Sequence, residues 1–134
     1  MTMKKFFIFL LFAFTANFVY SQNSFQKNLY SLNSEINTIQ KQLKEQDINN
    51  EILKTKFELT KSLNRLSEEA LSESLNGNLA KELAQLISYA CELGKQKLDF
   101  LESYKTYNNK FYLQKFTELD NIYLSIYLKI KTKE

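Results

Sequence analysis

Few side chains in this sequence have the types and spacing that chemistry requires. Glu69 and Glu73 stand four residues apart, which would place two carboxylates on one face of a helix. Such a pair could bind a metal ion or act as acid and base, but the chain contains no histidine, the commonest general base and metal ligand. We therefore interpret Glu69 and Glu73 as part of a solvated helix face. The sequence predicts no metal, no cofactor and no catalytic residue.

Cys91 is the only cysteine, so no disulfide can form within one chain. We interpret it as a small buried hydrophobic residue, with a reactive thiol or a disulfide-linked dimer as alternatives. A loop that cradles phosphate needs several glycines, and the chain has two. These absences argue against an enzyme, although an enzyme that works without histidine stays a distant alternative.

Residues 1–21 have the pattern of a secretory signal peptide. Lys4 and Lys5 precede an apolar run over residues 6–14, and small or polar residues lead to a predicted cleavage site between Ser21 and Gln22. The alternative, an uncleaved membrane anchor, is less favoured because the apolar run is shorter than the roughly 20 residues of a spanning helix. The sequence thus predicts an exported protein, periplasmic or extracellular, with one helical domain over residues 22–134 and no stable membrane anchor after cleavage.

The charge of the predicted mature chain indicates no particular partner. The 18 basic residues less Lys4 and Lys5, set against 15 acidic residues, leave a net charge of about +1. Arg65 is the only arginine, whereas nucleic-acid-binding proteins cluster Arg and Lys on one face. Nucleic acid is therefore not expected as a partner.

Apolar residues recur at alternating steps of three and four, which predicts amphipathic helices. Two such stripes precede residue 76: Phe25, Leu29, Leu32, Ile36, Ile39 and Leu43, then Ile52, Leu53, Phe57, Leu59, Leu63, Leu66, Ala70, Leu71 and Leu75. Two follow it: Leu79, Leu83, Leu86, Ala90, Leu93, Lys97, Phe100, Tyr104, Tyr107 and Phe111, then Tyr112, Phe116, Leu119, Tyr123, Ile126 and Ile130. Leu32, Ile36, Ile39, Leu83, Leu86 and Phe116 are expected to be buried.

Three polar stretches separate the stripes. Asn76-Gly77-Asn78 combines residues that tolerate a left-handed backbone, and further turns are predicted near residues 47–50 and 108–110. These turns favour an all-α, up-down-up-down four-helix bundle. The alternative is a long antiparallel helical hairpin or coiled coil that turns at Gly77, and such a rod would need a partner or a homodimer to cover its apolar surface.

Two residues of the third stripe are unusual. Gly94 either lets a neighbouring helix approach closely or ends a shorter helix, and the unbroken stripe beyond it favours the first reading. Lys97 stands where an apolar residue is due, and we expect its stem to lie along the edge of the core with the ammonium in water.

Aromatic residues crowd the C-terminal third of the chain, and most of them fall on the stripes. Tyrosines beyond the needs of a small core would suit a surface for a protein partner, with Tyr30, Tyr112 and Tyr127 as its candidates. Tyr30 and Tyr127 lie off the stripes and are expected to be partly exposed. The leading hypothesis is an exported protein that acts by macromolecular interaction without catalysis, and a chaperone-like or envelope-stress binding protein is the alternative.

Overall fold

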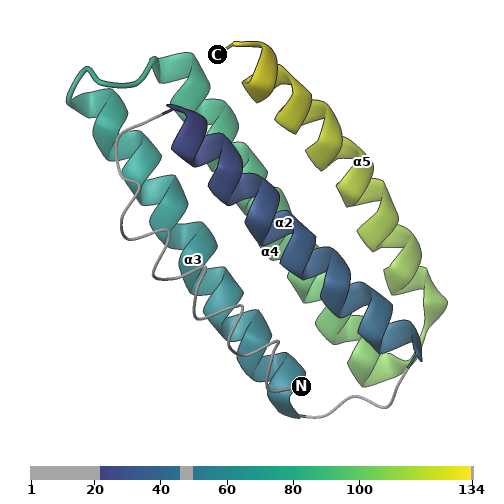
Figure 1. Cartoon of the computed structure of the whole chain (residues 1–134). Helices are drawn as coiled ribbons and strands as arrows, with labels where there is room; N and C mark the ends of the chain where they lie inside the picture. Colours follow the sequence, from purple (N-terminus) through teal and green to yellow (C-terminus); the bar gives the residue numbers. More distant parts are fainter. Residues whose placement is uncertain (1–21, 46–49, 134) are drawn as a thin grey trace.

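The computed structural model describes residues 22–45 and 50–133 of the chain. These residues form four helices, α2 (Gln22–Glu45), α3 (Asn50–Leu75), α4 (Lys81–Tyr107) and α5 (Lys110–Thr132). The helices pack against one another side by side, and successive helices run in opposite directions (Figure 1). The predicted all-α fold is confirmed. The predicted leader, residues 1–21, lies outside the described residues.

Helix α4 is central to the bundle, because it contacts α2, α3 and α5. Helix α2 runs in the same direction as α4 and packs against α4 and α3, and it meets α5 over a smaller area (Figure 1). The long hairpin that turns only at Gly77 is therefore wrong, since α2 folds back on the other helices. The break predicted near residues 47–50 falls between α2 and α3, and residues 46–49 lie outside the described part.

The predicted core is largely confirmed. All six stripe residues of α2 are buried, and Ile36, Ile39, Leu83 and Phe116 are each at most 2% exposed. Leu86 is only partly buried, because the buried seam of α4 runs through Leu83, Ile87 and Ala90 and leaves Leu86 at its edge.

The stripe predicted for the second helix was too broad. Among the α3 side chains that the structure describes, Leu59, Leu63, Leu66 and Ala70 are buried, whereas Phe57, Leu71 and Leu75 are exposed. The side chains of Ile52 and Leu53, also on the predicted stripe, lie outside the described part. Each residue turns the helix by about 100°, so Leu71 points away from the seam that contains Ala70.

The turn around Gly77 matches the prediction. Gly77 has a φ of +80°, in the left-handed region, and beyond its two chain neighbours no residue lies within 4 Å of where a Cβ would be. The backbone N–H of Asn78 donates to the Glu73 carbonyl oxygen at 2.8 Å and that of Gly77 to Ser74 at 3.1 Å, the two bonds of a Schellman motif. Glu73 is buried, contrary to the expectation of a solvated face, because its Oε2 accepts a bond from Asn78 Nδ2 at 2.9 Å.

The predicted turn at residues 108–110 is also present. Asn108 ends α4 with a φ of 50°, and its N–H donates to the Tyr104 carbonyl oxygen at 2.7 Å. The side chain of Asn109 then caps α5 by accepting from the N–H of Phe111 at 3.0 Å. Two adjacent asparagines thus end one helix and begin the next.

Gly94 lies within α4 at a close contact between helices, as favoured from the sequence. A Cβ at this position would stand 3.1 Å from Cδ1 of Leu63 and 3.4 Å from Cδ1 of Ile36. Because Leu63 belongs to α3 and Ile36 to α2, the missing side chain lets both helices approach α4 at the same level.

Candidate functional site

The expectation that the ammonium of Lys97 would lie in water is wrong. The residue is 0% exposed and points from α4 into the space between α2 and α5. A buried lysine needs acceptors for its three protons, because burying an unpaired ammonium costs on the order of several kcal/mol in lost hydration. Three side chains from the two flanking helices supply them.

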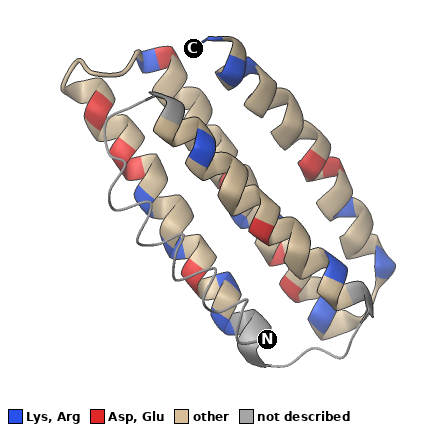
Figure 2. Cartoon of the chain, viewed as in Figure 1, with Lys and Arg blue, Asp and Glu red and all other residues tan. Residues whose placement is uncertain are grey.

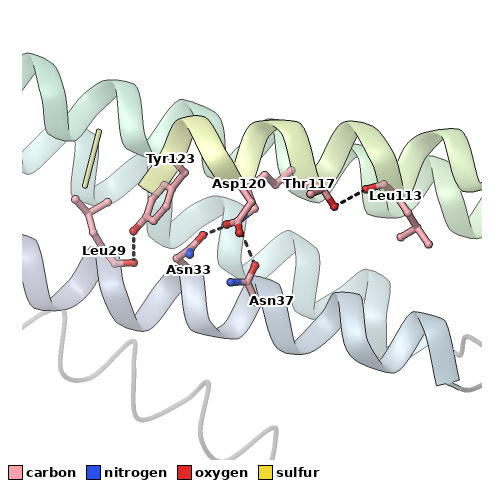
Figure 3. A network of polar contacts seen from close by, with 8 residues as sticks. Leu29, Asn33, Asn37, Leu113, Thr117, Asp120 and Tyr123 are labelled. Carbon is pink, nitrogen blue, oxygen red and sulfur yellow. Dashed lines mark hydrogen bonds and ion pairs between the residues drawn. The ribbon is translucent and has the colours of Figure 1, made fainter. Parts of the chain in front are cut away.

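The acceptors of Lys97 come from α2 and α5. Its Nζ lies 2.6 Å from Oδ1 of Asp120 and 2.6 Å from Oδ1 of Asn33, and 3.2 Å from Oδ1 of Asn37. Figure 3 shows Asn33 and Asn37 on one helix pointing toward Asp120 on the other. The three acceptors match the three protons of an ammonium, so every donor of a charged Lys97 has a partner.

Aromatic rings complete the surroundings of this ammonium. Nζ of Lys97 lies 4.7 Å from the centre of the Phe116 ring and 5.3 Å from that of Tyr123, both on α5. Burial lowers the pKa of Lys97, whereas the hydrogen bond to Asp120 and its charge act in the opposite direction. The ion pair and the ring faces therefore stabilise a charge that burial alone would disfavour.

Tyr123 links α5 to the backbone of α2. Its hydroxyl donates to the carbonyl oxygen of Leu29 at 3.0 Å (Figure 3). Burial raises the pKa of Tyr123, so the hydroxyl stays protonated as a donor. The contact between α2 and α5 thus relies on polar side chains as well as on apolar packing.

A groove of about 330 Å³ runs between α2 and α5 beside this ion pair. We call it the tyrosine groove; its lining residues are Tyr30, Asn33, Ser34, Asn37, Thr38, Lys41, Tyr123, Leu124 and Tyr127. The ring of Tyr127 stacks on that of Tyr123, with centres 6.1 Å apart, and its other neighbour is Tyr30 at 6.3 Å. The hydroxyl of Tyr127 accepts a bond from Gln26 Nε2 at 3.3 Å.

The structure brings together two of the three tyrosines proposed from the sequence. Tyr30, 65% exposed, and the half-buried Tyr127 both line the tyrosine groove, and their rings are in contact with centres 6.3 Å apart. Tyr112 lies at the turn between α4 and α5 instead, where its ring contacts those of Phe100, Tyr107 and Phe111 at 5.4–6.4 Å. It belongs to a separate aromatic cluster.

Cys91 is buried, in agreement with its interpretation as a small core residue, and it is a free thiol. Burial raises the pKa of this thiol to about 12, so almost none of it is the reactive thiolate at neutral pH. A reactive cysteine at this position is accordingly disfavoured.

The connection among Asn33, Asn37, Lys97 and Asp120 was not predicted from the sequence. A partial signal was present, since Asn33 and Asn37 are one helical turn apart and Asp120 lies between the inward-facing Phe116 and Tyr123. A charged residue on an apolar stripe, such as Lys97, is a reason to search the other stripes for its buried partner.

Charged side chains of both signs are interspersed over the bundle (Figure 2). Within residues 22–45 and 50–133, no three His, Cys, Asp or Glu side chains gather as a metal site would require. None of the described helices is long and apolar enough to cross a bilayer. Comparison with protein-family models, curated proteins and solved structures finds no significant match.

Proposed function

We propose that residues 22–134 form an exported protein that acts by binding a protein partner in the tyrosine groove, without catalysis. The observation that carries this proposal is the composition of the groove. Tyr30 and Tyr127 provide rigid aromatic area over the buried Tyr123, and Asn, Ser and Thr side chains beside them provide adaptable hydrogen bonds. Antibody binding surfaces use the same combination, and tyrosine is enriched in interfaces generally.

The exposure of Tyr30 supports this assignment. An aromatic ring that is 65% exposed contributes little to the fold, and here it borders a concave surface. A partner that covers the ring would bury apolar area at a low cost in side-chain entropy.

The state of Lys97 supports a role without catalysis. A lysine nucleophile must be a free amine open to a substrate, whereas Lys97 is fully buried beside a carboxylate and donates to Asp120, Asn33 and Asn37. Converging buried polar groups could indicate an active site, but these groups satisfy one another. Their arrangement fits the positioning of α2 against α5.

The test of the binding proposal is capture of a partner by variants of the full chain. Tyr30→Ala is expected to reduce the amount of captured protein about tenfold or more, because an aromatic anchor at an interface contributes about 2 kcal/mol. Its melting temperature should be unchanged, since the ring is mostly exposed. The measurement is quantitative pull-down from an envelope fraction together with thermal unfolding.

Tyr89→Ala is the matched control, because Tyr89 is an exposed tyrosine on α4 that does not line the groove. Equal capture by Tyr30→Ala and the unmodified chain would contradict the proposal. So would an equal loss with Tyr89→Ala, which would indicate nonspecific adhesion to exposed rings.

Export has its own test. We expect N-terminal sequencing of the protein recovered from outside the cytoplasm to begin close to Gln22, because the pattern of residues 1–21 predicts cleavage after Ser21. A recovered protein that begins at Met1 or Thr2 would rule out a cleaved leader.

A further inference from the structure

We propose that the tyrosine groove binds a carboxylate group of an acidic peptide segment, through the amides of Asn33 and Asn37 and the ammonium of Lys41. This inference rests on the proposed function and names the chemistry of the ligand.

The buried ion pair orients the two amides. Oδ1 of Asn33 and Oδ1 of Asn37 both accept protons from Lys97, and the reverse orientation would place an NH₂ group against an ammonium. The Nδ2 groups are therefore left as donors, and both asparagines line the groove. A ligand that supplies acceptors suits these donors.

The charge of the groove favours an anion. Of the lining residues, Lys41 is the charged one, and it is exposed on α2. Lys97 and Asp120 lie next to the groove, but their charges compensate each other across 2.6 Å. The groove therefore has the net charge of Lys41, and a carboxylate complements it better than a neutral or cationic group.

The remaining lining residues suit the body of a peptide. Tyr30, Leu124 and Tyr127 offer aromatic and apolar area beside the amide donors. The volume of about 330 Å³ is at the small end of ligand sites, which fits one or two residues of a bound segment.

The experiment compares two probes that differ in one group. N-acetyl-L-phenylalanine carries a carboxylate, and N-acetyl-L-phenylalanine amide replaces it by a neutral amide. Each is titrated into the isotope-labelled chain while the side-chain NH₂ signals of Asn33 and Asn37 are followed by NMR. The acid is expected to shift these signals with about fivefold higher affinity than the amide, the factor of one exposed ion pair.

Lys41→Gln is expected to lower the affinity for the acid about fivefold and to leave the affinity for the amide unchanged. Lys54→Gln is the matched control, because Lys54 is an exposed lysine on α3, and it should change neither affinity. Added salt should weaken binding of the acid only, since screening acts on the ion pair.

Equal binding of acid and amide, or tighter binding of the neutral sugar N-acetylglucosamine, would overturn the carboxylate proposal. The same holds if neither probe shifts the Asn33 and Asn37 signals. The proposed function would survive these results if Tyr30→Ala still reduced partner capture, and it would fail separately if Tyr30→Ala had no effect.

Discussion

Asp120→Ala is expected to lower the free energy of unfolding by about 3 kcal/mol, because it leaves the ammonium of Lys97 buried without a counter-ion. The value lies at the lower end for a broken buried pair, since the Asp120 side chain is 25% exposed and water can enter. Lys97 itself is 0% exposed, and the two asparagines that remain carry no charge. Urea unfolding of the variant and the unmodified chain measures the difference.

Lys97→Met is the companion variant, because it removes the buried charge and keeps a side chain of similar length. Lys97→Met should lower the free energy of unfolding by less than Asp120→Ala does, because the carboxylate of Asp120 that remains can reach water. Combining Lys97→Met with Asp120→Leu should recover most of the loss, as replacement of buried ion pairs by apolar groups often does. If Asp120→Ala proves neutral, Lys97 has another way to satisfy its charge and the ion pair does not position α2 against α5.

Ile36→Ala is expected to cost about 2–5 kcal/mol, the range for large-to-small substitutions in a core. Ile36 is 0% exposed, and its Cδ1 lies 3.4 Å from where a Cβ of Gly94 would stand. Truncation would open a cavity at the level where α2, α3 and α4 meet, so the structure has little freedom to collapse around it. The measurement is again unfolding by urea or heat.

Leu75→Ala is the control for Ile36→Ala, because Leu75 is 89% exposed although it fell on the predicted stripe. It should change the free energy of unfolding by less than about 0.5 kcal/mol. Leu86→Ala should lower the free energy of unfolding by an amount between those of Leu75→Ala and Ile36→Ala, because Leu86 is partly buried. A large effect of Leu75→Ala would mean that this leucine is covered in solution, for instance by a second copy of the chain.

The features that were predictable from the sequence are those that depend on neighbours along one helix. Steps of three and four identified the six buried apolar residues of α2, from Phe25 to Leu43, but not buried polar residues such as Asn28 and Asn33. Asn76-Gly77-Asn78 and Asn108-Asn109 identified two helix ends, because a left-handed backbone requires such residues. Excess apolar residues such as Leu71 and Phe57 could not be separated from the core in this way, since a periodic pattern does not fix the width of the contact.

The features that were not predictable depend on contacts between helices. Lys97 was expected to reach water because a long side chain at the edge of a stripe does so when only its own helix is taken into account. Its acceptors are 60 or more residues away on α2, at Asn33 and Asn37, and 23 residues away on α5, at Asp120. The tyrosine groove likewise exists only because α2 and α5 lie side by side. Tyr30 and Tyr127 could therefore each be predicted as interaction residues, but their contact with each other could not.

The burial of Cys91 makes the formation of a disulfide between two chains depend on whether the chain is folded. The chain has one sulfur nucleophile, it is 0% exposed in the bundle, and its pKa is about 12. Two folded copies therefore do not expose this thiol to each other, and cross-linking of two chains requires α4 to be unpacked. In an oxidising medium, the yield of disulfide-linked dimer would thus measure how long the chain stays unfolded with Cys91 accessible. A chain that folds quickly would remain monomeric.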